Sequence, residues 1–135
     1  VKFAAIDLKT HAVVWENKQT TPGVGTPVSS GDWIFAGLSE GSIACWDART
    51  GEVKWTQESD DGFYSSPIAA GDRIYVMDRT GRMFIFKADG GAYQAIGQAV
   101  LGEESVATPA IYGDTLIIRG AKNLYRIGAP SPQAK

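Results

Sequence analysis

The 135-residue chain has one cysteine, one histidine and two methionines, and these low counts exclude several kinds of site. One cysteine cannot form an internal disulfide, and one histidine cannot supply a zinc site built from several imidazoles. No apolar run approaches the roughly 18 residues that a membrane-spanning helix needs. A formal net charge of -2 leaves no basic excess for nucleic acid. We therefore expect no membrane span and no nucleic-acid binding.

Sequence signatures of catalysis are also absent. The chain contains no Gly-x-Ser-x-Gly nucleophile elbow and no Walker-type phosphate loop. Adjacent acidic residues occur at Asp60-Asp61 and Glu103-Glu104, in connections where such pairs are usually solvated surface. Asp60, Asp61 and the nearby Ser59 lack the oxygen-ligand spacing of a calcium loop. Cys45 lies in an apolar stretch, where a thiol behaves as a small hydrophobic group. We therefore predict no catalytic, cofactor-binding or metal-binding residue.

The sequence does contain a repeat. A Ser/Thr-Pro pair followed by three residues and Gly-Asp occurs three times, with the prolines at Pro27, Pro67 and Pro109, 40 and 42 residues apart. In phase with it, Ile6–Trp15 matches Trp46–Trp55, again 40 residues apart. A period of this length indicates one supersecondary unit that is repeated along the chain.

Each unit is predicted to form strands and no helix. Short runs rich in β-branched and aromatic residues lie between Gly-Asp and a turn in all three copies. The next run in each copy alternates so that both faces are largely apolar, which suits a sheet packed between neighbouring sheets. Four such strands in about 40 residues are typical of a β-propeller blade.

The turn before the fourth strand leads to further predictions. Gly51 and Gly91 are expected to supply positive φ there, a conformation that glycine adopts readily. His11 occupies the same place in the first copy, and histidine tolerates this region better than most residues. In the fourth strand, Trp55 is matched with Ala95 of the next copy.

The predicted fold is all-β: a partial β-propeller of four-stranded antiparallel blades. Its units are a partial blade over residues 1–18, blades over 26–58 and 65–98, and a partial blade over 106–127. Residues 129–135 are expected to form a flexible C-terminal tail. Because propellers have about four to eight blades, these units do not close a ring. The missing blades of a longer protein are therefore expected partners of this chain.

This tandem pattern resembles the PQQ-type quinoprotein repeat over residues 1–128. The tryptophan-docking motif of that family, Ala-x-Asp-x-x-x-Gly-x-x-x-Trp, matches two copies here, with histidine replacing the glycine in one and cysteine replacing the alanine in the other: Ala5, Asp7, His11 and Trp15, then Cys45, Asp47, Gly51 and Trp55. The third copy keeps only Gly91.

The resemblance implies a structural role for the motif. In the family, the indole ring packs on the peptide before the turn glycine of the next blade, where a bare glycine leaves the peptide face open. Trp15 is then expected against Thr50-Gly51, and Trp55 against Gly90-Gly91.

A WD-repeat propeller is the alternative family. Cys45-Trp46-Asp47 contains its signature dipeptide. The other copies have isoleucine or phenylalanine at the position of Trp46, and the chain has no Gly-His pair. The WD reading is therefore the weaker of the two.

The resemblance allows two functions. PQQ-type repeats occur in quinoprotein dehydrogenases, in the propeller lipoprotein of the outer-membrane β-barrel assembly machinery and in cofactor-free relatives. We expect a non-catalytic scaffold for a protein partner, with Phe63 and Tyr64 as candidate contacts or, alternatively, as side chains packed under the next blade. The second hypothesis is part of a PQQ-dependent dehydrogenase, with PQQ and calcium as cofactors. The resemblance also implies export to the periplasm or the extracellular space.

Overall fold

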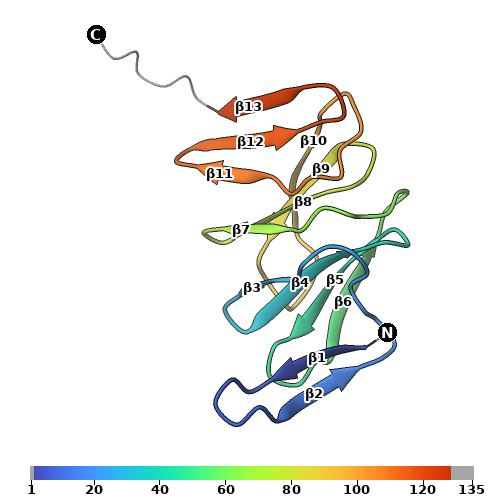
Figure 1. The fold of residues 1–135 in the computed structure, drawn as a ribbon, viewed down its shortest axis with the longest axis vertical. Coiled ribbons are helices and arrows are strands. Elements are labelled where there is room, and N and C mark those ends of the chain that lie inside the picture. The colour runs from blue at the N-terminus through green and yellow to red at the C-terminus, as the bar shows by residue number, and fades with distance from the viewer. Residues whose placement is uncertain (1, 129–135) are drawn as a thin grey trace.

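A computed structural model describes residues 2–128, which contain thirteen β-strands and no helix. The predicted tail over 129–135 lies outside the described residues. The strands form four antiparallel sheets, called blades A to D in chain order, and Figure 1 shows them following one another along the long axis of the molecule. The all-β fold predicted from the sequence, a partial propeller of antiparallel blades, is confirmed.

The two end blades are incomplete and the two central blades have four strands each. Blade A consists of β1 (Phe3–Ile6) and β2 (Val13–Asn17). Blade B consists of β3 (Val28–Ser30), β4 (Trp33–Leu38), β5 (Ser42–Asp47) and β6 (Val53–Glu58). Blade C consists of β7 (Ile68–Ala70), β8 (Arg73–Met77), β9 (Arg82–Lys87) and β10 (Ala95–Val100). Blade D consists of β11 (Ala110–Tyr112), β12 (Thr115–Arg119) and β13 (Leu124–Gly128).

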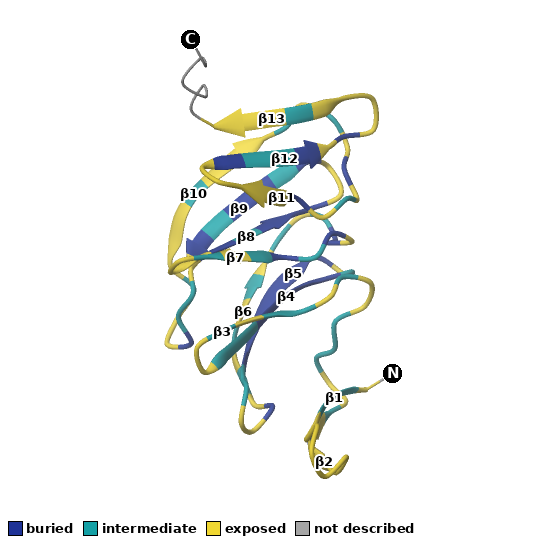
Figure 2. Cartoon of the chain, turned by 60° about the vertical axis from the view of Figure 1, so that its left-hand side comes forward, coloured by how far each residue is buried: buried dark blue, intermediate teal, exposed yellow. Residues whose placement is uncertain are grey.

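The hydrophobic core lies between the blades. The largest cluster joins blades B and C, and it consists of buried side chains from both sheets and one connection: Phe35, Ile43, Cys45, Phe63, Ile74, Val76, Phe84 and Phe86. A smaller cluster of Met77, Met83 and Ile118 joins blades C and D. Figure 2 shows burial concentrated in the central strands of blades B and C. The central strands of blades B and C therefore bury side chains on both faces, as the apolar pattern of the repeat predicted, while the outer strands β6 and β10 stay largely exposed.

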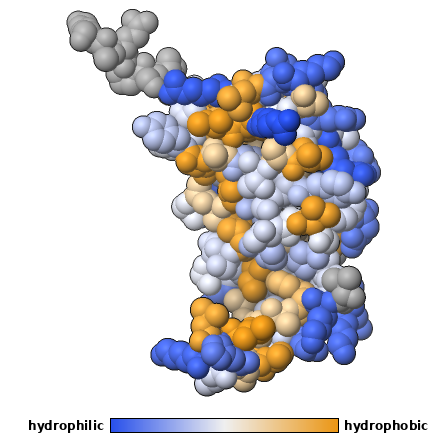
Figure 3. Space-filling view, in the orientation of Figure 1, coloured by the Kyte–Doolittle hydropathy of each residue, from blue (hydrophilic) through white to orange (hydrophobic). Residues whose placement is uncertain are grey.

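Blades A and D leave large apolar side chains in solvent. Leu8 and Val14 of blade A are 89% and 56% exposed, and Tyr112 and Leu124 of blade D are 74% and 73% exposed. Figure 3 shows apolar atoms gathered over blades A and D, at the two ends of the row. The positions in blades B and C that match Leu124 are the buried Ile43 and Met83, so blade D exposes there a surface that a neighbouring blade would cover.

The structure corrects the sequence alignment of the third docking motif. The amide of Asp47 donates to the carbonyl of Glu52, whereas that of Lys87 donates to Gln94, so the β9–β10 turn is two residues longer than the β5–β6 turn. Trp55 pairs with Cys45 in β5, and the residue that pairs with the matching position in β9 is Gly97. The match of Trp55 with Ala95 was therefore wrong, because an insertion in the turn shifts the fourth strand.

Candidate protein-interaction surface

The two motif tryptophans bind carbonyls of the next blade. Trp15 is buried, and its indole nitrogen donates to the carbonyl of Ala48 at 2.9 Å. A β-carbon on Gly51, whose φ is +72°, would collide with the Trp15 ring, so the ring lies directly on this turn. The indole nitrogen of Trp55 donates to the carbonyl of Asp89, also at 2.9 Å. Both side chains connect consecutive blades, an arrangement in which a large apolar ring keeps its one polar group bonded.

The turn that receives Trp55 differs from the prediction. Gly91 is not among the glycines with positive φ, and a β-carbon there would meet only the Asp89 side chain. The neighbouring Gly90 lies under the ring of Trp33, at the start of β4. The prediction of positive φ at Gly91 was therefore wrong, because the longer turn does not repeat the geometry of Gly51. Trp33 was missed because the motif contains no residue at its position.

The motif aspartates hold the tight turns of blades A and B. One carboxylate oxygen of Asp7 accepts from the amides of Lys9 and Thr10, and Asp47 accepts in the same way from Arg49 and Thr50. These backbone hydrogen bonds hold the pKa values of Asp7 and Asp47 below the usual aspartate range. They bring His11 to φ 58° and Gly51 to φ 72°, so the two residues occupy matching positions.

A chain of hydroxyl bonds connects the Ser/Thr-Pro segments of successive blades. The amide of Thr26 donates to the hydroxyl of Ser66 at 2.8 Å, and the amide of Ser66 donates to the hydroxyl of Thr108 at 2.9 Å. Each hydroxyl therefore satisfies a backbone group of the preceding blade rather than of its own segment. We call these three residues the hydroxyl ladder.

The two candidate partner contacts have opposite environments. Phe63 is fully buried, and its ring occupies the space that a side chain on Gly37 would need. Phe63 is therefore a core residue, and its assignment as a partner contact was wrong. Tyr64, the next residue, is 39% exposed, and the guanidinium of Arg79 lies 5.1 Å from its ring centroid. Only Tyr64 of this pair lies at the surface, beside a positive charge.

The acidic pairs contribute to blade junctions. Asp60 accepts from the Arg82 guanidinium at 3.2 Å, which joins the connection after β6 to β9. Glu103 accepts from the amides of Lys122 and Asn123 in the β12–β13 turn. A hydrogen bond from the Tyr125 hydroxyl, followed by these amides, lowers the pKa of Glu103 below its usual value and raises that of Tyr125. Glu103 therefore secures the blade D hairpin to the connection from blade C.

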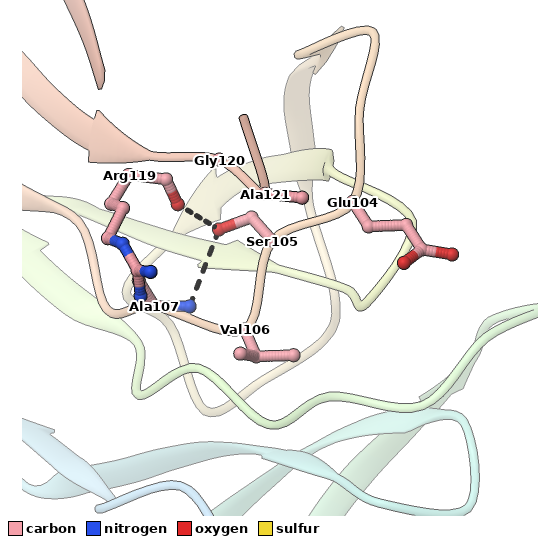
Figure 4. A pocket seen from close by; sticks show the side chains of 7 residues that line it. All are labelled: Glu104, Ser105, Val106, Ala107, Arg119, Gly120 and Ala121. Atoms are coloured by element: carbon pink, nitrogen blue, oxygen red, sulfur yellow. Dashed lines mark hydrogen bonds between the residues drawn. The ribbon is translucent and has the colours of Figure 1, made fainter. Parts of the chain in front are cut away.

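Two shallow hollows lie where the connection from β10 passes blades C and D. One, of about 200 Å³, is drawn in Figure 4 and is lined by Glu104, Ser105, Val106, Ala107, Arg119, Gly120 and Ala121. The hydroxyl of Ser105 donates to the carbonyl of Arg119 at 2.7 Å, and this bond fixes the floor of the hollow. The other, of about 310 Å³, is lined by Asp61, Arg79, Thr80, Glu104 and Val106. Glu104 and Val106 line both hollows.

Within residues 2–128, no three His, Cys, Asp or Glu side chains converge as a cation site would require. Cys45 is buried and unpaired, and burial raises the pKa of its thiol to about 12, which keeps it protonated. No helix in this part of the chain is long and apolar enough to cross a bilayer.

The profile of the family described as outer membrane protein assembly factor BamB matches residues 2–128. The chain belongs to this family. BamB of Salmonella typhimurium is 29% identical over 93 residues, which cover 69% of this chain and 23% of that protein. The quinoprotein alcohol dehydrogenase PedE of Pseudomonas putida is 34% identical over 65 residues, 47% of this chain and 10% of the enzyme. The chain thus spans less than a quarter of either relative.

Solved structures show the same fold. BamB from Moraxella catarrhalis superposes with a TM-score of 0.67 at 23% identity, over 87% of this chain and 37% of that one. A europium-containing methanol dehydrogenase superposes with a TM-score of 0.60 at 18% identity, over 77% of this chain and 21% of the enzyme. The BamB-family fold is therefore shared by assembly factors and by enzymes, and fold alone does not choose between them.

Proposed function

We propose that this chain is part of a non-catalytic propeller that binds a protein partner, within an exported protein located in the periplasm or the extracellular space. The observation that carries the proposal is the extent of the BamB match, which runs through all four blades from residue 2 to residue 128. In pairwise alignment, BamB of Salmonella typhimurium covers 69% of the chain and PedE covers 47%. The described surface supports binding by contact, with an exposed tyrosine beside an exposed arginine at Tyr64 and Arg79.

The relatives suggest the class of partner. They are named outer membrane protein assembly factors, so the proposed partners are proteins that assemble or insert into an outer membrane. The other blades of the intact protein are the second set of partners. They would cover the apolar faces that blades A and D expose.

The test uses the intact protein in its own host. Its gene is deleted, and the outer-membrane proteins are quantified by mass spectrometry, with complementation as the control. We expect the abundance of β-barrel proteins to fall several-fold and to recover on complementation. Unchanged abundance would contradict the proposed function.

The second candidate is part of a PQQ-dependent dehydrogenase, and the 34% identity with PedE favours it. Ligands for PQQ and calcium would then come from blades outside this chain. The purified intact protein is incubated with PQQ and calcium and assayed for dye-linked alcohol oxidation. Turnover that depends on PQQ would establish the enzyme and overturn the non-catalytic proposal.

A further inference from the structure

We propose that the connections entering the inner strands of blades B, C and D form a rail that binds an extended segment of the partner protein. This inference rests on the proposed function and names the surface that performs it. The rail consists of Val24, Tyr64 and Val106, together with the guanidinium of Arg79. Each of the three rail residues lies three positions before the proline of its repeat.

The rail residues are exposed in every repeat. Val24 is 64% exposed, Tyr64 39% and Val106 58%, although all three are large apolar or aromatic side chains. The residues that precede Tyr64 and Val106, namely Phe63 and Ser105, are buried to 0% and 4% exposure. The backbone therefore turns one side chain inward and the next outward in the same way in both blades. A single exposed valine needs no explanation, but the same exposure at one register of three repeats indicates a surface.

The spacing of the rail is fixed by the hydroxyl ladder. Thr26, Ser66 and Thr108 each lie two positions after a rail residue, and their bonds of 2.8 and 2.9 Å tie the three connections together. A β-carbon on Gly25 would lie 2.7 Å from the Ser65 carbonyl oxygen, so the first two connections are in direct contact. An extended strand places side chains on one face about every 6.6 Å. We expect alternate residues of such a strand to contact successive connections of the rail.

The positive charge of Arg79 indicates that the bound segment is acidic at one position. The Arg79 guanidinium lies over the Tyr64 ring, and no carboxylate among residues 2–128 lies within 4.0 Å of it. Asp61 and Glu104 line the same hollow as Arg79 without forming an ion pair with it. A guanidinium that is already positioned on an aromatic ring favours a carboxylate ligand. The segment is therefore expected to carry an acidic residue on the same strand face as the side chain that contacts Tyr64, two positions away from it.

The test measures peptide binding to the intact protein by fluorescence anisotropy. The probe is a nine-residue peptide with valine at positions 1, 3, 7 and 9 and glutamate at position 5, so that these five side chains share one face of the extended peptide. One comparison peptide has the same composition with the valines grouped, and another has lysine in place of glutamate. We expect the alternating acidic peptide to bind at least about fivefold more tightly than either, because only it matches both spacing and charge. Equal affinity for the three peptides would overturn the proposal.

Variants of the intact protein complete the test. Val106→Ser and Arg79→Gln should each weaken the alternating peptide, and Arg79→Gln should abolish the preference for glutamate over lysine. Val100→Ser is the matched control, because Val100 is 74% exposed on β10 and lies outside the rail. Circular dichroism checks that each variant is folded. If the gene deletion lowers β-barrel abundance while the rail variants restore it fully, the proposed function stands and the rail is wrong.

Discussion

The junction between blades B and C and the junction between blades C and D join equivalent strands by different means. At the B–C junction, Trp55 packs against Phe35, Phe86 and Tyr93, with ring centroids 5.6 to 6.0 Å apart. At the C–D junction, the position of Trp55 is Gly97, where a β-carbon would meet nothing within 4 Å. The repeat therefore keeps its strand register even at the C–D junction, where no tryptophan ring occupies the position of Trp55.

Other contacts join blades C and D in the absence of a tryptophan ring. The methionine-containing cluster of Met77, Met83 and Ile118 is smaller, and a hollow of about 420 Å³ lies beside Tyr75 and Ile127. The carboxylate of Glu103 supplies a polar link to the blade D hairpin. The comparison teaches that the repeat forms a junction both with a large aromatic cluster and with a smaller apolar cluster accompanied by the hydrogen bonds of Glu103.

Truncation of equivalent residues should show the largest contrast. Phe86 is fully buried at the B–C junction, and Ile127 occupies the matching position of blade D with 48% exposure. Phe86→Ala should destabilise the intact protein by about 3–5 kcal/mol, because it leaves a cavity among aromatic rings. Ile127→Ala should cost about 1 kcal/mol or less. Urea unfolding followed by tryptophan fluorescence measures both, and equal costs would remove the distinction between the junctions.

The next largest difference is expected between the stability costs of substituting the turn glycines Gly51 and Gly91. Gly51 has φ 72° and carries the Trp15 ring, so Gly51→Ala should cost about 2–3 kcal/mol through backbone strain and displacement of the ring. Gly91→Ala is the matched control, with an expected change within about 0.5 kcal/mol, because its β-carbon would meet only the Asp89 side chain. Thermal unfolding of both variants checks this. A large loss from Gly91→Ala would mean that the two turns are equivalent after all.

Placing a tryptophan at Gly97, the position that matches Trp55, should change the free energy of unfolding by a smaller amount and in the stabilising direction. Gly97→Trp should stabilise the protein by about 0.5–1 kcal/mol, because it replaces a strand glycine and adds apolar contact between blades C and D. Gly97→Ala separates the backbone contribution from that of the ring. The midpoint of urea unfolding is the measurement, and a Gly97→Trp variant less stable than Gly97→Ala would show that the space does not accept an indole.

The polar link should respond to acid with the smallest effect. The folded-state pKa of Glu103 is depressed, so its contribution to stability is present above its usual pKa of 4.5 and is lost as pH falls through the lower folded value. The amide resonances of Lys122 and Asn123 should shift in that acidic window in NMR spectra of the intact protein. Glu103→Gln should show the altered resonances already at neutral pH, and unchanged spectra would place the link elsewhere.

The fold could be predicted from the sequence because the repeat recurs at positions where the backbone conformation requires proline or glycine. Pro27, Pro67 and Pro109 mark the inner strands, and the Gly-Asp turns that follow have φ of 57°, 60° and 56° at Gly31, Gly71 and Gly113. These positions depend on local conformation, which a single sequence encodes. Alternation within the strands then fixed which faces are buried.

The sequence predicted the candidate surface only in part. Tyr64 lies at the surface, but Phe63 beside it is buried, because burial there depends on the absence of a side chain at Gly37 in another strand. The shift from Ala95 to Gly97 followed from a longer turn that no local signal marked. Val24 and Val106 are ordinary valines in the sequence, and their shared exposure became visible only once the repeats were placed side by side.

The hydroxyl ladder has a consequence for how such proteins diversify. Each of its bonds runs from an amide in one repeat to a hydroxyl in the following repeat, so the segment of Ser66 has an acceptor at one boundary and a donor at the other. A tandem duplication or loss of one gene segment would create a new boundary with the same head-to-tail chemistry. Lineages carrying this repeat can therefore change the number of units without redesigning how they join.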